Sequence, residues 1–371
     1  MTYLGSPSLI ILPGGGMLAS HDYFGPGCPG NSLGQGNLTS LYRSDDSGLT
    51  WASVGHLNGL IWGSLFLHGD HLYIIGVSRE FGDIVIRRSE DGGYTWTRPA
   101  DARSGLLFEG GAAQELPNYH GSAMPVLNHR GRLYTTFEDA RRPNTVIPGS
   151  GGIRGVTGIQ AFVISVAADA DLLDASNWVM SNKLDLNADH APEGWPEMLD
   201  LNWREGSLAV TPAGEIWSMM CVKGRPQVEK TAIVKVDADG RRVSFDPSTG
   251  LIDFPGGMTK FTIRQEETTG IYWTLTNPNM NPDFVNQRNV LALYSSDDLE
   301  SWKRRATILE DDSDLSPEES AERTGFQYAS WQFDGADIVF ALRTAYNGAA
   351  NYHDSNRITF HRIRDFRSLQ N

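Results

Sequence analysis

The 371-residue sequence lacks several features that mark common protein classes. It has only two cysteines, Cys28 and Cys221, which allow one disulfide at most and lie in no metal-like cluster. It has no long apolar run, so we expect no transmembrane helix. Its first residues lack a basic segment ahead of an apolar stretch, so no signal peptide is visible. Convincing helical periodicity over a long window is also absent, which leaves strands as the main expected element.

Positive charge is scarce as well. The 31 Lys and Arg residues stand against 45 Asp and Glu residues, and the net charge is −14. This balance argues against nucleic acid and anionic membrane surfaces as partners, but an anionic saccharide could bind at a local cluster of Arg or Lys. We expect a monomer. The location is extracellular or periplasmic if a leader was removed, and cytoplasmic otherwise.

Metal ligands do not form a recognisable pattern in the sequence. The nine histidines make neither an HxH nor an HExxH cluster, so we expect no metal and no cofactor. A Ca²⁺ held by carbonyls and carboxylates at the centre of the fold is left open.

One motif occurs twice. Ser44-x-Asp46-x-Gly48-x-Thr50-Trp51 returns as Ser89-x-Asp91-x-Gly93-x-Thr95-Trp96, and the two tryptophans are 45 residues apart. In such a stretch Asp accepts backbone N–H groups in a turn, Gly supplies a positive φ, and Trp wedges between sheets. The motif predicts a hairpin between outer strands, with Asp46 and Asp91 as scaffold rather than chemistry.

The spacing of this motif predicts the architecture. Repeats of roughly 40–50 residues with turn signals are typical of propeller blades, each a four-stranded sheet. Decayed copies follow at 295–302, where Ser295 and Asp297 match the motif, and at 169–178. We therefore predict an all-β fold with 1–371 as one β-propeller domain. It has seven blades at about 50 residues each, with six larger blades as the alternative.

The repeated turn resembles the Asp-box of sialidase-type propellers. Sialidases also carry an Arg-Ile-Pro stretch, two further arginines that bind the sialate carboxylate, and a Tyr–Glu nucleophile pair. This sequence has no Arg-Ile-Pro, which disfavours a sialidase.

Longer stretches resemble propeller enzymes that remove terminal L-rhamnose α-1,4-linked to D-glucuronic acid on arabinogalactan, a group that includes a lyase family and an α-L-rhamnosidase family. The resemblance covers nearly the whole chain and rests on "GSPSLIILPGGGMLASHDYFGPG" (5–27), "NYHGSAMPVLNHRGRLYTTFEDA" (118–140), "NWREGSLAVTPAGEIW" (202–217), "PGGMTKFTIR" (255–264), "GFQYASWQFDGADI" (325–338) and "RTAYNGAANYHDSNRITFHRIRDFR" (343–367).

Candidate catalytic residues follow from the chemistry of elimination at a uronate. The enzyme must neutralise the carboxylate, remove the C5 proton and protonate the leaving oxygen. Arg204 suits the first task because its fork grips a carboxylate. His120 and Tyr328 suit the proton transfers. His21, with Asp22 orienting its ring, is the second candidate histidine.

Further residues are expected to bind substrate. Trp203 could stack on a sugar face, although Arg204 and Glu205 could instead form a surface pair. Lys260, Arg343 and His353 lie in stretches that carry the resemblance. The last such residue, Arg154, lies in a Gly-rich loop that could reach over the pocket.

Three hypotheses follow. The first is a lyase that releases rhamnose and leaves an unsaturated uronate. The second is an α-L-rhamnosidase that hydrolyses the same linkage through a histidine. The third is a sialidase-like hydrolase or a carbohydrate-binding propeller without catalysis, since a fold does not fix a function.

Overall fold

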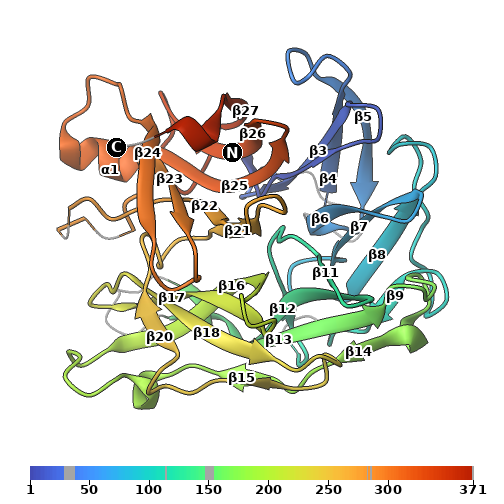
Figure 1. The fold of residues 1–371 in the computed structure, drawn as a ribbon, viewed down its shortest axis with the longest axis horizontal. Helices are drawn as coiled ribbons and strands as arrows, with labels where there is room; N and C mark the ends of the chain where they lie inside the picture. The colour runs from blue at the N-terminus through green and yellow to red at the C-terminus, as the bar shows by residue number, and fades with distance from the viewer. Residues whose placement is uncertain (29–37, 113–114, 147–153, 282, 285, 370–371) are drawn as a thin grey trace.

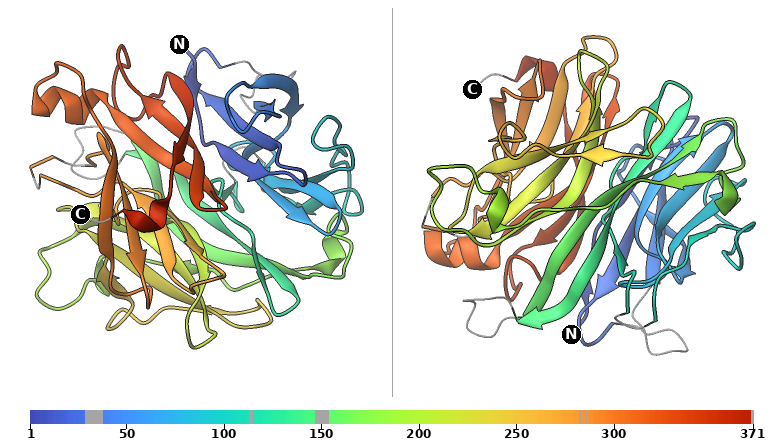
Figure 2. Two further views of the ribbon diagram at one scale, coloured as in Figure 1. Left: turned by 45° about the horizontal axis from the view of Figure 1, so that its top comes forward. Right: turned by 90° about the horizontal axis from the view of Figure 1, so that it is seen from below.

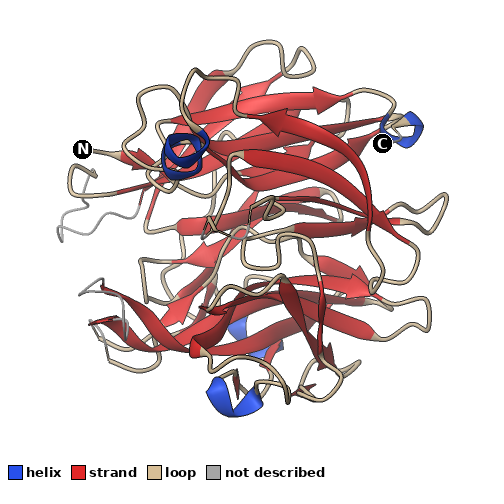
Figure 3. Cartoon of the chain, turned by 90° about the vertical axis from the view of Figure 1, so that its left-hand side faces the viewer, coloured by secondary structure: helices blue, strands red, loops and turns tan. Residues whose placement is uncertain are grey.

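Six antiparallel β-sheets stand around a common centre in the computed structural model (Figure 1), which describes the chain except residues 29–37, 113–114, 147–153, 282, 285 and 370–371. Strands dominate, and the helices are short (Figure 3). They are α1 (Pro317–Arg323) and the 3₁₀ turns η1 (Ala175–Asn177), η2 (Ala188–His190) and η3 (Phe366–Ser368). No described helix is both long and apolar enough to cross a membrane.

The first three blades come from the N-terminal half. Blade 1 contains β1 (Tyr3–Leu4), β2 (Ser8–Ile11), β3 (Met17–Phe24), β4 (Leu38–Ser44) and β5 (Ala52–Asn58). Blade 2 contains β6 (Ile61–His68), β7 (His71–Val77), β8 (Ile84–Ser89) and β9 (Leu106–Phe108). Blade 3 contains β10 (Tyr119–His120), β11 (Leu127–His129), β12 (Arg132–Val146), β13 (Arg154–Ala167), β14 (Trp178–Met180) and β15 (Leu184–Asp185).

The last three blades complete the ring. Blade 4 contains β16 (Leu199–Val210), β17 (Ile216–Arg225), β18 (Lys230–Val236), β19 (Val243–Ser244) and β20 (Leu251–Asp253). Blade 5 contains β21 (Thr262–Gln265), β22 (Tyr272–Thr276), β23 (Val290–Ser296) and β24 (Lys303–Glu310). Blade 6 contains β25 (Gly325–Asp334), β26 (Asp337–Ala345) and β27 (Arg357–Ile363).

The propeller prediction is confirmed, but the main prediction of seven blades is wrong, and the alternative of six applies. Dividing the chain length by a standard repeat length gave the wrong number of blades because the strands differ in length from blade to blade. The hairpin of β12 and β13 alone has strands of 15 and 14 residues. Chain length therefore overestimates the number of sheets when some strands extend well beyond the usual five or six residues.

The two Asp-box turns are scaffold, as expected. In the first, Asp46 Oδ1 accepts the Thr50 N–H at 2.8 Å and Oδ2 accepts the Thr50 hydroxyl at 2.6 Å. The Trp51 indole donates to the Gly48 carbonyl at 3.2 Å. Asp91 makes the same bonds to Thr95 in the second turn. The turns connect β4 to β5 and β8 to β9, at the outer edges of their blades.

The decayed copy between β23 and β24 is shifted by one residue from its sequence match. The hydrogen bonds are made by Ser296 and Asp298, with Asp298 Oδ1 accepting the Ser301 N–H at 2.7 Å. Trp302 donates to the carbonyl of Leu299, which has a φ of 71°. The expectation that Ser295 and Asp297 form this turn is therefore wrong, because the turn is one residue shorter than the complete motif.

Serine hydroxyls connect the inner strands of successive blades. Ser8 accepts the Leu65 N–H at 2.9 Å, and Ser64 accepts the Met124 N–H at 2.9 Å. Ser207 and Ser330 accept from Ile263 and Leu9 in the same way, each at 2.9 Å. The last bond joins blade 6 to blade 1, and these terminal blades lie side by side (Figure 2). A backbone bond from the Leu4 N–H to the Ser355 carbonyl at 3.1 Å also joins these two blades, and no strand is exchanged between the described sheets.

Candidate active site

A cavity of about 630 Å³ lies at the hub, where the inner strands converge. Its lining is mostly polar and carries both charge signs. Basic side chains come from Arg204, Lys223 and Arg343, and carboxylates come from Asp22, Glu80 and Glu205. The other lining residues are Gly5, Ser6, Tyr23, Phe24, Gly25, Pro26, Cys28, Ile61, Trp62, His120, Gly121, Tyr328 and His353. In a chain with net charge −14, three basic side chains gather in one cavity beside an equal number of carboxylates, so contact with an anionic ligand group depends on the basic side chains that it reaches.

The same backbone irregularity places three lining side chains. β6, β16 and β25 each contain a β-bulge in their pairing with the next strand. The bulges hold Trp62, Glu205 and Tyr328 at φ values of 53°, 52° and 57°. Non-glycine residues rarely adopt this left-handed conformation, and bulges commonly re-aim side chains next to active sites. Three equivalent strained positions around one cavity therefore make this cavity the candidate functional site.

Two of these three residues form a direct pair. The Tyr328 hydroxyl donates to Glu205 Oε1 at 2.7 Å, although the residues are 123 positions apart. Burial raises the pKa of the Tyr328 hydroxyl, and the Glu205 charge raises it further. Arg343, Lys260 and Arg288 lie 5.1, 5.8 and 6.0 Å from the centre of the Tyr328 ring. These cations would stabilise a phenolate if the proton moved to Glu205.

Asp22 contributes a second carboxyl group to the cavity. Its Oδ1 accepts the Thr39 hydroxyl at 2.6 Å, and its Oδ2 accepts the Trp62 N–H at 2.7 Å. Burial raises its pKa to about 7, despite these hydrogen bonds and the charge of Arg343. A carboxyl group with such a pKa is protonated in a large fraction of molecules near neutral pH and can serve as a general acid.

His120 belongs to a buried hydrogen-bond network. Its Nδ1 lies 2.9 Å from Glu138 Oε2, and Glu138 Oε1 accepts the backbone N–H of Glu205. Burial alone would raise the pKa of Glu138, but the hydrogen bond from His120 and the charges of His120 and Arg204 lower it overall. Glu138 therefore acts as a carboxylate between a cavity histidine and the backbone of Glu205.

The structure brings five of the nine predicted site residues to this cavity, namely His120, Arg204, Tyr328, Arg343 and His353. Arg343 is held by the His353 carbonyl at 2.5 Å and the Ser355 hydroxyl at 3.2 Å.

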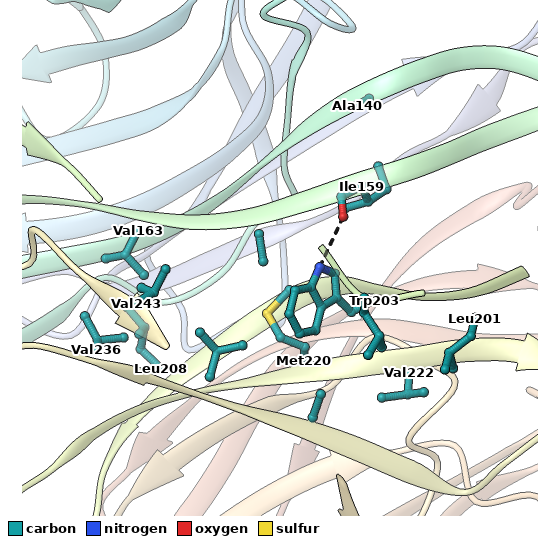
Figure 4. Close-up of a cluster of buried hydrophobic side chains, with 14 of the residues drawn as sticks. Ala140, Ile159, Val163, Leu201, Trp203, Leu208, Met220, Val222, Val236 and Val243 are labelled. Carbon is teal, nitrogen blue, oxygen red and sulfur yellow. Dashed lines mark hydrogen bonds between the residues drawn. The ribbon is translucent and has the colours of Figure 1, made fainter. Parts of the chain in front are cut away.

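Two predicted residues lie elsewhere. His21 neighbours Asp22 in β3, so its side chain points to the opposite face of the strand. It stacks on Tyr42 at 5.5 Å beside a separate groove, and its Nδ1 contacts the Asp22 carbonyl rather than the carboxylate. Trp203 is fully buried and donates to the Ile159 carbonyl at 3.2 Å (Figure 4), so it packs in the core and cannot stack on a sugar.

The remaining two predicted residues are Lys260 and Arg154. Lys260 is 3% exposed and lies behind Tyr328 rather than at the cavity wall, and burial lowers its pKa to about 8. The side chain of Arg154 lies outside the described residues. Cys28 and Cys221 are not joined in a disulfide, and no cluster of three metal-ligating side chains occurs in the described part of the chain.

The sequence reasoning missed Glu205 and Glu138 and gave Asp22 only a supporting role. A usable signal exists, because Trp62-Gly63-Ser64, Glu205-Gly206-Ser207 and Tyr328-Ala329-Ser330 share one pattern. In each, the first residue occupies the bulge and the serine accepts a backbone N–H from the next blade. Aligning these triplets would have placed Glu205 beside Tyr328 at the hub.

No family model matches the chain, and no curated protein matches it in sequence. Solved structures do match. An α-L-arabinanase of Penicillium chrysogenum is 14% identical, with a TM-score of 0.58 over 99% of this chain and 94% of that one. An α-L-arabinofuranosidase of Fusarium graminearum is 13% identical, with a TM-score of 0.59 over 98% and 93%. The chain shares their fold. A Trypanosoma rangeli sialidase is 13% identical, with a TM-score of 0.55 over 98% of this chain and 54% of its own.

Proposed function

We propose that this chain is a glycoside hydrolase that removes a terminal sugar from an anionic glycan. The hydrogen bond between Tyr328 and Glu205 is the observation that carries the proposal. A tyrosine nucleophile with a glutamate partner is an established exception to the usual pair of catalytic carboxylates in glycosidases. The cavity volume of about 630 Å³ lies within the range of sites for one small ligand, which suits the end of a glycan rather than its middle.

The residues present support a two-step reaction with retention. In the first step Glu205 takes the proton of the Tyr328 hydroxyl as its oxygen attacks the anomeric carbon. Asp22 gives its proton to the leaving oxygen, so the glycosidic bond breaks as the bond to Tyr328 forms. In the second step Asp22 takes a proton from water, the water oxygen displaces Tyr328, and Glu205 returns the proton to the phenolate. The cations around Tyr328 stabilise the phenolate that leaves.

The cavity cations favour an anionic sugar ring. Arg204, Lys223 and Arg343 come from β16, β17 and β26, so they lie in the same two blades that supply Glu205 and Tyr328. Arg forks bind carboxylates with two hydrogen bonds, while Lys offers a point charge. The proteins of similar structure support hydrolysis of a glycan, since they are an arabinanase, an arabinofuranosidase and a sialidase.

A second candidate is the activity of the lyase family that the sequence resembles. Such a lyase would cleave L-rhamnose from α-1,4-linked D-glucuronate by β-elimination. His120, Arg204 and Tyr328 all line the cavity, which supports this candidate. Elimination uses Arg204 on the uronate carboxylate and His120 on the C5 proton. It leaves no necessary task for Glu205 at Tyr328, and we therefore favour hydrolysis.

Product analysis on gum arabic and on a sialylated oligosaccharide separates these mechanisms. Hydrolysis releases a reducing sugar, whose first-formed anomer ¹H NMR identifies, without new ultraviolet absorbance. We expect retention and a loss of product in Tyr328→Phe. The ultraviolet band of a conjugated ene-carboxylate would overturn hydrolysis in favour of elimination. If neither glycan yields a product, the proposed substrate class is wrong.

A further inference from the structure

Glu138 is a buried carboxylate that the two-step reaction does not use. It lies in β12 of blade 3 with 2% exposure, yet it contacts two residues of the cavity. One oxygen faces His120 Nδ1 at 2.9 Å, and the other accepts the backbone N–H of Glu205 from blade 4. A buried carboxylate is costly unless its partners compensate, so its presence needs an explanation beyond packing.

The cross-strand pair near the cavity differs between blade 2 and blade 3. In blade 2 the cross-strand pair directly before the bulge is Ile61 and Val77, and both side chains are apolar. In blade 3 the pair leading into the cavity is His120 and Glu138. The fold therefore tolerates an apolar pair at this end of an inner strand.

A related arrangement occurs at Asp22. Its carboxylate accepts the N–H of the bulge residue Trp62 in the next blade, as the Glu138 carboxylate accepts the N–H of the bulge residue Glu205. In both cases a carboxylate from one blade supports a left-handed residue in the next. Support of this kind holds the strained backbone in place.

The orientation of the His120 ring is also fixed. Trp62 lies against it with ring centres 4.3 Å apart, and Phe81 stacks on it at 5.9 Å. A carboxylate has no hydrogen to donate, so Nδ1 carries the proton in the bond to Glu138. When the ring is neutral, Nε2 keeps its lone pair, and this atom has no hydrogen-bond partner among the described residues. Because His120 lines the cavity, its lone pair is available to a ligand.

We propose that Glu138 is a positioning residue with two tasks. It fixes the His120 tautomer, so that Nε2 accepts a hydrogen bond from a hydroxyl group of the bound sugar. It also holds the backbone of Glu205 in the conformation that brings the Glu205 carboxylate to Tyr328. The inference rests on the proposed hydrolytic function and assigns to that site a specificity for a substrate hydroxyl beside Trp62.

Glu138→Gln tests the first task while it preserves the second. The amide oxygen can still accept the Glu205 N–H, but the amide NH₂ then faces His120 Nδ1 and forces the proton to Nε2. A long-range ¹H–¹⁵N spectrum of histidine-labelled protein should show Nδ1 protonated in the wild type and Nε2 protonated in the variant. On gum arabic we expect kcat/KM to fall by roughly 10- to 100-fold, mainly through KM.

Asp139→Asn is the matched control. Asp139 is the next residue of β12, is equally buried, and accepts from Lys183 at 2.5 Å and from the Asn118 N–H at 2.8 Å. It should lower stability without changing the His120 spectrum or kcat/KM. Two outcomes would overturn the proposal. One is a wild-type spectrum that shows His120 Nε2 protonated, and the other is an unchanged kcat/KM in Glu138→Gln. If gum arabic is not cleaved at all, the proposed hydrolysis of that glycan fails. The ¹H–¹⁵N spectrum of the histidines still tests whether Glu138 fixes the tautomer of His120.

Discussion

Asp91 at the rim and Asp22 at the hub are both hydrogen-bonded aspartates, but their pKa values shift in opposite directions. The hydroxyl and N–H of Thr95 lower the pKa of exposed Asp91 to about 2. Burial raises the pKa of Asp22 to about 7, although Thr39 and Trp62 donate to it. A rim carboxylate is satisfied within its own turn, whereas the hub carboxylate Asp22 depends on another strand of its own blade and on a strand of the next blade. Local sequence therefore builds the rim, and the closed ring creates the hub.

The largest difference should appear when one carboxylate at the hub and one half-exposed carboxylate away from the hub are neutralised. Glu205→Gln prevents proton transfer from Tyr328, and we expect kcat to fall by at least about 10³-fold with little change in the melting temperature. Glu215→Gln is the control, because Glu215 is half exposed and bonds only Trp217 and Lys235 away from the hub. Equal activity of the two variants would remove Glu205 from the mechanism. Initial rates and thermal melts supply both readouts.

The second prediction separates packing from chemistry at adjacent positions. Trp203→Ala should lower the free energy of unfolding by about 3–5 kcal/mol, the usual cost of deleting a large buried aromatic side chain. Chemical denaturation followed by circular dichroism measures this change. Arg204→Ala should instead weaken substrate binding and leave most of the stability intact. A stable Trp203→Ala protein with raised KM would restore the predicted sugar-stacking role.

The sequence predicted best what one strand or turn determines by itself. The Asp-box bonds of Asp46 and Asp91 involve only residues of the same turn, so the motif was sufficient. Blade number was not predictable, because it depends on how far strands such as β12 and β13 extend.

The candidate site was predicted only in part for a similar reason. His120, Arg204 and Tyr328 were found as polar residues in characteristic stretches, and all three line the cavity. His21 was misplaced because alternation along β3 directs Asp22, and not its neighbour, to the hub. Glu205 was missed because its partner Tyr328 is 123 residues away and only ring closure brings the two together.

The third prediction uses the pH dependence of activity to test whether Asp22 is the general acid. If Asp22 is the general acid, it works in the protonated form, which dominates below a pKa of about 7. Activity should therefore decline as pH rises through about 7. Asp22→Asn should lose roughly 10²-fold in kcat and show no such decline. A wild-type rate that stays constant from pH 6 to about 9 would contradict the assignment, since Asp22 would then be ionised without consequence.

The smallest effect is expected at the rim, and its pH dependence has the opposite sign. Asp91→Asn weakens the hydrogen bonds to Thr95, so the melting temperature should fall measurably while kcat stays unchanged. Because the pKa of Asp91 is lowered from 3.8 to about 2 in the fold, its contribution to stability is present above pH 3.8 and disappears as pH falls toward 2. The difference in melting temperature between wild type and variant should therefore shrink over that interval. A difference that persists at the lower pH would show that the Asp91 charge does not stabilise the turn.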